Sequence, residues 1–203
     1  MSERPLSVPA AIEARRSIRR YTDAPVPDAD LEQIVALAGR APSAWNVQPW
    51  RFVAVRDPAV KARLKDAAYG QAQVGAAPVV LVLYSDMLGA LERFEDAVHP
   101  GMPEEARRNT VAQVRGIFGA QPADQREAWG AGQSYIALGF LLLAAQSLGY
   151  ATSPMLGFDP AAVKSILSLP DHATVPAIVA LGVAAEDGFP THRLPLETTL
   201  RVI

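Results

Sequence analysis

The strongest constraint on the fold is a long predicted helix over residues 123–148, whose second half is apolar on nearly every side. A surface helix keeps one polar face toward water, so a helix without such a face belongs in the middle of a protein or at a large interface. Its longest apolar stretch, residues 135–145, is too short to span a bilayer and is interpreted as a buried helix. Other elements, or a partner chain, therefore have to cover it.

Four apolar or β-branched runs predict strands, at 50–55, 79–84, 150–155 and 175–183. The second run, VVLVLY, is apolar without alternation, which is typical of a central strand covered on both faces. Helices are also expected at 10–16, 28–41, 57–69, 160–167 and, with an interruption near residue 99, over 86–118. The elements alternate without a regular βαβ ladder, so the sequence predicts an α+β fold with a central sheet. No linker or repeat divides residues 1–203, which are expected to form one domain.

Charge and cysteine content exclude several classes of protein. The 203 residues carry a formal net charge of −2 and include no cysteine. Such a chain has no general electrostatic attraction for nucleic acid or an anionic membrane, and neither is expected as a partner. Without cysteine, disulfides, thiolate nucleophiles, iron–sulfur clusters and cysteine-based zinc sites are excluded. The first residues show no secretory signal, and a cytoplasmic location is expected.

Residues 15–21, RRSIRRY, concentrate four arginines and a serine in a chain that is acidic overall. Arginine binds phosphate through paired N–H donors and does not lose its charge. The segment is interpreted either as a site for one phosphate group or as a solvated basic turn. A nucleic-acid surface is less favoured, because the rest of the chain adds no basic patch.

Residues 41–52, APSAWNVQPWRF, place two prolines, two amides and two tryptophans at the start of a predicted strand. Amide side chains donate and accept hydrogen bonds at once, which suits a flat heterocycle with carbonyls and ring nitrogens. Turns also collect Pro, Asn and Ser for local reasons. A tight turn above buried tryptophans is therefore the alternative interpretation.

Other candidate motifs are weak. One acidic stretch has helical spacing, with Glu92, Glu95, Asp96 and His99. One histidine among carboxylates is more typical of a solvated helix end, so no metal is expected. The glycines over 130–139 lie inside a predicted helix and do not form a dinucleotide-binding loop. The glycine in 154–160 would permit close approach of a ligand, although that segment also suits an ordinary strand-to-helix loop.

Taken together, these segments resemble the FMN-dependent nitroreductase family. The resemblance rests on RRSIR at 15–19, APSAWNVQPW at 41–50, the helix over 133–148, PMLGFD at 154–159 and HRLP at 192–195, in the family's order and spacing. It implies an α+β homodimer with a central, mostly antiparallel sheet, an extended C-terminal tail and FMN bound in the interface.

The resemblance implies which residues of this chain contact the flavin phosphate, ribityl chain and pyrimidine ring. The phosphate and ribityl positions are matched by Arg15, Arg16, Ser17 and Arg193. Arg19 matches a basic residue at the pyrimidine edge of the flavin, and Gln71 matches an amide there.

Two further groups of positions match the family. The residues that match contacts from the other subunit are Pro42, Ser43, Ala44, Asn46 and Gln48. The residues that match the loop over the central flavin ring are Pro154, Met155, Leu156 and Gly157. Leu156 and Thr191 stand where several members have an acidic and a basic residue, respectively.

The resemblance implies an oxidoreductase in which NADH or NADPH reduces bound FMN and a nitroaromatic, quinone or similar acceptor is reduced in turn, with ping-pong kinetics. No catalytic side chain is expected, since the flavin carries the chemistry. A fixed cation such as Arg19 would stabilise the reduced flavin more than the oxidised one. Alternatives are a flavoenzyme of the same fold with other chemistry, such as reductive dehalogenation, flavin reduction or flavin fragmentation, and a flavin sensor without turnover.

Overall fold

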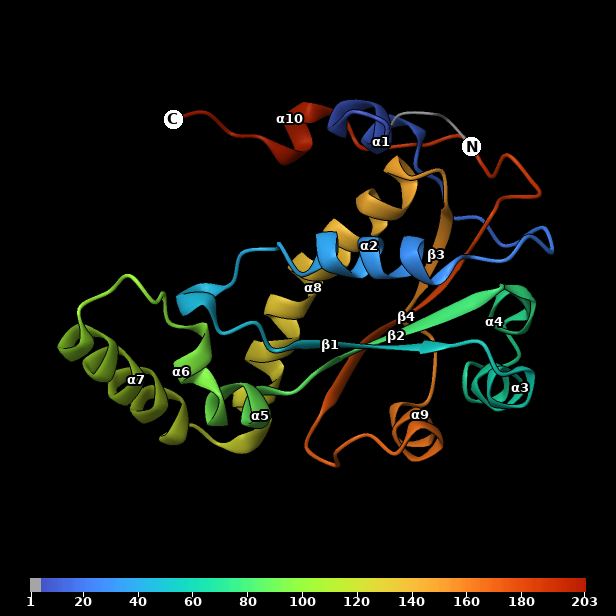
Figure 1. Ribbon diagram of the computed structural model, residues 1–203. Coiled ribbons are helices and arrows are strands. Elements are labelled where there is room, and N and C mark those ends of the chain that lie inside the picture. Colours follow the sequence, from blue (N-terminus) through green and yellow to red (C-terminus); the bar gives the residue numbers. More distant parts are fainter. Residues whose placement is uncertain (1–4) are drawn as a thin grey trace.

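A computed structural model describes residues 5–203 and shows an α+β fold built on one four-stranded antiparallel sheet (Figure 1). The strands are β1 (Trp50–Val55), β2 (Val79–Ser85), β3 (Ala151–Met155) and β4 (Thr174–Gly182). Their order in the sheet is β1-β2-β4-β3, so β2 and β4 are central and β1 and β3 form the edges. The fold class and all four strands are confirmed, with bounds that differ from the prediction by one residue at most.

Both faces of the two central strands are buried, which explains their unbroken apolar sequences. Residues of β2 with odd numbers, such as Leu81, pack with β4 residues such as Val179 into one core that includes α2 and α8. The even-numbered residue Val82 and its partner Ile178 face a second core with α3, α4 and α9. Because neighbouring side chains point to opposite faces, a strand covered on both sides needs apolar residues at every position.

Helices occupy the two faces and one end of this sheet. The first face carries α1 (Val8–Ala14), α2 (Asp28–Ala38) and α8 (Ala123–Ser147), with α1 packed on α8. The second face carries α3 (Pro58–Ala67), α4 (Ala72–Ala76) and α9 (Pro160–Leu167). A third apolar cluster forms around α5 (Met87–Glu92), α6 (Phe94–Ala97) and α7 (Glu104–Gly119).

The long helix α8 is central to the fold and is also partly open. Among the described residues it is the one helix long and apolar enough, by length and composition, to cross a membrane. It packs along the sheet and against α2, as a core helix does, and Ala137, Leu141 and Ala145 are buried in the first core. Other side chains of the helix are exposed, among them Tyr135 and Phe140, although the Tyr135 hydroxyl still donates to the Pro176 carbonyl of β4 at 3.1 Å. The expected burial is thus correct for the side that faces the sheet, and the rest of the helix surface is only partly covered within residues 5–203.

Several elements differ from the sequence-based expectation. The helix expected over 86–118 breaks at Arg93 as well as near His99, which gives three helices in place of two. The short helices α4, η1 (Ala44–Asn46) and α10 (Leu196–Thr199) were not expected. The segment after β4 contains α10 where an extended tail was expected, and its residues from 189 onward are all exposed.

The contact of α8 with β2 and α5 leads to a stability prediction at Gly130. A Cβ atom on Gly130 would lie 2.2 Å from Met87 Cγ and 2.5 Å from Ser85 Oγ. Alanine is a better helix former than glycine by about 1 kcal/mol, but overpacking a tight contact costs about 1–3 kcal/mol. We therefore expect Gly130→Ala to destabilise the protein in urea unfolding. The matched control is Gly116→Ala in α7, where a Cβ meets nothing within 4 Å and a small stabilisation is expected; equal effects of the two substitutions would contradict the close packing.

Candidate functional site

The arginine-rich segment runs from the end of α1 along the free edge of β3. Ser17 forms a parallel bridge with Thr152, and the Ile18 N–H donates to the Thr152 carbonyl at 3.1 Å. Tyr21 then forms an antiparallel bridge with Ala184, just beyond β4. These backbone contacts hold residues 15–21 in one conformation at the β3 edge.

The C-terminal segment folds back over these residues. The backbone N–H groups of Arg19 and Arg20 donate to one oxygen of Glu186 at 2.7 and 3.2 Å. Gly188 follows with φ of +70°, and a Cβ there would lie 2.9 Å from Ile18 Cδ1 and 3.0 Å from Arg16 Cβ. Only glycine suits both the positive φ and the close approach. Glu186 and Gly188 therefore direct the following residues across the arginines.

The two segments line a polar cavity of about 220 Å³ that is open to solvent, since residues 189–193 are all exposed. Five residues predicted to bind the flavin phosphate, ribityl chain or pyrimidine ring line this cavity. Four come from the N-terminal segment and one from the C-terminal segment: Arg15, Arg16, Ser17, Arg19 and Arg193. The other lining residues are Phe189, Pro190, Thr191 and His192. Residues about 175 positions apart in the sequence thus line the same small cavity. Their separation in the sequence does not indicate that they are close in space.

The charge in this cavity is not neutralised by carboxylates. Within residues 5–203, no ion pair joins a carboxylate to Arg15, Arg19 or Arg193. Burial, followed by the charges of Arg193 and Arg16, lowers the pKa of Arg15. Crowded guanidinium groups repel one another, so a bound anion would be stabilised here by several charge-assisted hydrogen bonds. The alternative of a merely solvated basic turn does not explain why a distant arginine joins the group.

Gln71 lies beside the loop that follows β3. Its Nε2 donates to the Gly157 carbonyl at 2.7 Å, and its Oε1 accepts from Gln73 Nε2 at 3.2 Å. Pro154 and Met155 end the strand, whereas Leu156 is 64% exposed. Gln71 therefore lies next to the 154–157 loop, as its predicted role requires. Its amide N–H is bonded to the loop backbone, which holds the loop in place.

The loop before β1 has an unusual backbone conformation. Trp45, Asn46 and Gln48 have φ values of +51°, +59° and +49°. Such values are uncommon for residues other than glycine and persist only where surrounding contacts hold them. Ser43 Oγ accepts from the Gln48 N–H at 3.0 Å, and Gln133 Oε1 on α8 accepts from the Ala44 N–H at 3.0 Å. The loop that starts at Pro42 is thus fastened both to itself and to α8.

The two amides of this loop are partly used within the chain. Asn46 Nδ2 donates to the Ala97 carbonyl at 2.8 Å, and Gln48 Nε2 donates to the Asn46 carbonyl at 3.2 Å. Each amide keeps its oxygen and one N–H for another partner. Trp45 packs edge-on against Phe118 at 5.9 Å between ring centroids, and Trp50 is buried in the first core. Trp50 is therefore buried as the turn interpretation expects, whereas Trp45 is 46% exposed and packs at the surface, and the amides also stay at the surface.

The two sets of predicted site residues lie at opposite edges of the sheet. The arginine segment and the 154–157 loop adjoin β3, whereas residues 42–48 lead into β1. Strands β4 and β2 separate the two edges. One chain therefore does not bring the two sets together in one place.

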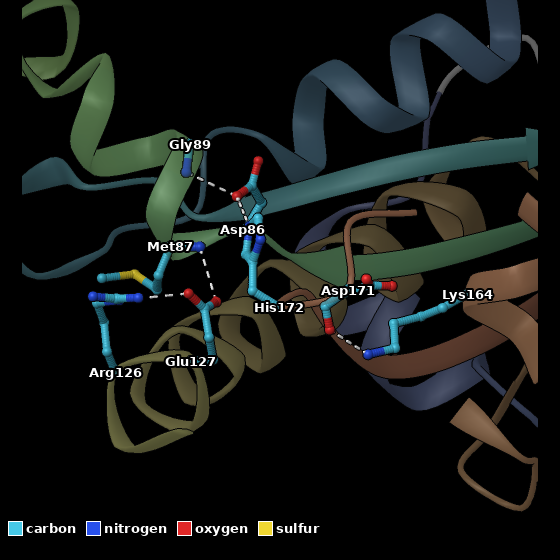
Figure 2. A network of polar contacts seen from close by, with 8 residues as sticks. All are labelled: Asp86, Met87, Gly89, Arg126, Glu127, Lys164, Asp171 and His172. Carbon is cyan, nitrogen blue, oxygen red and sulfur yellow. Dashed lines mark hydrogen bonds and ion pairs between the residues drawn. The ribbon is translucent and has the colours of Figure 1, made fainter. Parts of the chain in front are cut away.

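A polar network next to the β1 edge was not found from the sequence (Figure 2). Asp86, at the end of β2, caps α5 by accepting from the Gly89 N–H at 2.8 Å, and the same oxygen contacts His172 Nε2 at 2.9 Å. Burial raises the pKa of Asp86, but the hydrogen bonds with His172 and Gly89 and the charges of His172 and Arg51 leave it lowered overall. Nearby, the 4% exposed Glu127 accepts from the Met87 N–H at 3.1 Å. His172 has no local sequence signal, since its partner is 86 residues away.

The acidic stretch that was considered as a metal site has other contacts. Glu95 pairs with Arg115 at 3.1 Å, and His99 Nδ1 accepts from the Gly101 N–H at 3.0 Å. Within residues 5–203, no three His, Asp or Glu side chains gather in a way that could hold a metal ion.

Comparisons with known proteins agree with this architecture. Residues 12–183 match the sequence profile of the Nitroreductase family. A Thermus thermophilus protein named NADH dehydrogenase is 53% identical over 95% of this chain and 94% of its own length. YdgI of Bacillus subtilis, assigned as an NAD(P)H nitroreductase, is 32% identical over 92% and 93%. A solved structure of a protein from Exiguobacterium sibiricum, assigned as a nitroreductase and in complex with FMN, is 28% identical, with a TM-score of 0.90 over 100% of both chains.

The lowered pKa of Asp86 predicts an acid-sensitive contribution to stability. A carboxyl whose pKa is lower in the folded protein than in the unfolded chain stabilises the fold above the unfolded value of about 4, and this contribution is lost as the pH falls further. At neutral pH we expect Asp86→Asn to lower the free energy of unfolding by about 1–2 kcal/mol. The difference from the wild type should shrink in urea titrations as the pH falls below about 4.

The control for this prediction is Asp28→Asn. Asp28 also pairs with an arginine, but its side chain is 81% exposed, so its removal should cost under about 1 kcal/mol. A gap between Asp86→Asn and the wild type that stays constant down to pH 3 would show that the carboxylate charge is not what stabilises the contact.

Proposed function

Because the chain belongs to the nitroreductase family, we propose that it is an oxidoreductase that binds FMN and takes electrons from NADH or NADPH. The whole of residues 1–203 would serve as one FMN-binding domain. The FMN complex of the Exiguobacterium relative supports the cofactor, and the name NADH dehydrogenase of the Thermus relative supports NADH as the donor.

The observation that carries this proposal is the cationic cavity between residues 15–19 and 189–193. FMN ends in a phosphate group, and no described carboxylate pairs with Arg15 or Arg193. Their guanidinium groups offer N–H donors to it, although Arg193 Nη1 also donates to the His192 carbonyl at 2.7 Å. The cavity is small, about 220 Å³, which suits one phosphate better than an extended nucleic acid. The donor set therefore fits the group that the family uses.

The remaining residues at the β3 edge fit the rest of the cofactor. Arg19 would place a positive charge near the pyrimidine ring and so favour the reduced form. Gln71 would hold the 154–157 loop through Gly157, leaving the loop backbone to face the ring. FMN, when bound, supplies the hydride chemistry, so the protein contributes binding, orientation and charge and no acid or base of its own.

The other half of the site would come from a second copy of the chain. Residues 42–48 are held rigidly at the β1 edge, and Asn46 and Gln48 keep amide oxygens free for a ligand. Exposed apolar side chains are concentrated on α1, α8 and the C-terminal segment, among them Ile12, Ile136 and Leu196. Exposed apolar surface of this kind is typical of a subunit interface. A homodimer would cover these side chains and join the two edges.

We infer that the electron acceptor is a small planar molecule such as a nitroaromatic or a quinone. Donor and acceptor would use the same open face in turn, which gives ping-pong kinetics. The deciding experiment is an anaerobic titration of the purified protein with NADH and NADPH, followed in the visible spectrum. A bound yellow chromophore that bleaches with either donor is expected. A protein that is colourless and stays so after incubation with FMN would refute the proposal.

Removing the phosphate ligand should weaken cofactor binding. We expect Arg15→Ala to lower the affinity for FMN by about 1.5–3 kcal/mol, or roughly ten- to a hundredfold, measured by quenching of FMN fluorescence. The matched control is Arg20→Ala, because Arg20 belongs to the same segment, pairs with Glu186 and does not line the cavity. Equal affinities of the two variants would remove Arg15 from the phosphate site.

A mixed dimer tests whether the site is split between subunits. Arg15→Ala and Gln48→Ala each damage both sites of a homodimer. In a heterodimer with one chain of each kind, a split site predicts one doubly damaged and one intact site, so FMN content should return to about half of the wild-type value. If all groups of a site came from one chain, each site would keep one defect and no recovery would be seen.

A further inference from the structure

Gln48 has a left-handed backbone conformation that is unfavourable for a residue other than glycine. Its φ of +49° lies in the left-handed region, where a residue with a Cβ is strained. The Ser43 Oγ contact holds its N–H group, at 3.0 Å. Its carbonyl group has to be held as well if the side chain is to point in one direction.

The Gln48 carbonyl is held by Arg51. Arg51 Nη1 donates to the Gln48 carbonyl at 2.9 Å and to the Trp50 carbonyl at 2.8 Å. Arg51 belongs to β1, opposite Tyr84 of β2, and its side chain is half-buried. One guanidinium group therefore fixes the backbone on both sides of Pro49.

The charge of Arg51 lies near that of Asp86, although no ion pair joins the two side chains among the described residues. Burial and the charge of Arg93 lower the pKa of Arg51, and the carboxylate of Asp86 and Tyr84 act in the opposite direction. Asp86 is itself fixed by Gly89 and His172 (Figure 2), and its backbone N–H donates to the Pro49 carbonyl at 2.9 Å. Arg51 and Asp86 together thus hold three consecutive carbonyls, those of Gln48, Pro49 and Trp50.

We propose that Arg51, supported by Asp86, is a positioning residue for the FMN site: it keeps Gln48 in its left-handed conformation so that the Gln48 amide can reach the cofactor in the partner subunit. The inference rests on the proposed function. In this proposal Arg51 does not touch the cofactor itself; it acts through Gln48, which does.

The first test compares two arginines at the β1 strand. Arg51→Met removes the guanidinium that holds Gln48, and we expect FMN to dissociate at least about tenfold more readily in fluorescence titrations. Arg56→Met is the matched control. Arg56 also donates to a backbone carbonyl, that of Val26 at 2.8 Å, and pairs with an aspartate, but it lies at the far end of the strand from Gln48. It should change FMN affinity by less than about twofold. Equal losses in the two variants would overturn the inference.

The second test is a double-mutant cycle with Gln48→Ala. If Arg51 acts through the Gln48 side chain, Arg51→Met should change FMN affinity by less than about twofold once that side chain is absent. The same loss in both backgrounds would show that Arg51 does not work through Gln48. A general loss of structure would weaken binding in either background and so cannot mimic the expected result.

Folding and the proposed function are controlled separately. Urea unfolding reports whether Arg51→Met is folded; if it is not, the cycle is run with Arg51→Lys, which keeps the charge and one donor and should retain more affinity than any neutral substitution that folds. Wild-type protein that binds FMN, together with an Arg51 effect that persists without Gln48, refutes this inference alone. Wild-type protein that binds no FMN refutes both.

Discussion

The architecture depends on burying both faces of β2 and β4. Their side chains are apolar at nearly every position, so helices have to cover the sheet on both sides, and no polar site can open on either face. Polar chemistry is left to the sheet edges. One edge, β3, receives the arginine segment and the C-terminal segment, and the other, β1, receives the amide loop.

The two edges are prepared in different ways. At β1 the backbone N–H and carbonyl groups of the loop form hydrogen bonds with the side chains of Ser43, Gln133 and Arg51. These bonds hold the loop rigidly in a strained backbone conformation. At β3 the cavity gathers the positive charges of Arg15, Arg19 and Arg193, none of which forms an ion pair with a carboxylate among the described residues. A planar, anionic ligand needs both a rigid surface and positive charge; the β1 loop offers the first and the arginine cavity the second.

Much of the fold could be predicted from the sequence because its signals are local. The unbroken run of β2 and the Asp57-Pro58 start of α3 each depend on neighbouring residues alone. The five residues of α4 are too few to show a helical period, so that helix was missed. The arginine and amide segments stood out by composition. The contacts that organise them did not, since Glu186 lies 167 residues from Arg19 and His172 lies 86 from Asp86, and only the folded chain brings them together.

The placement of the two half-sites on opposite edges has a consequence for how cofactor occupancy depends on the amount of protein. If every complete site draws one edge from each of two chains, the number of complete sites follows the square of the chain concentration when chains are scarce. Cofactor binding would then be coupled to dimer formation. Each bound cofactor would stabilise the dimer, and each dimer would provide two binding sites. A cell that makes little of this chain would hold disproportionately little of its active form.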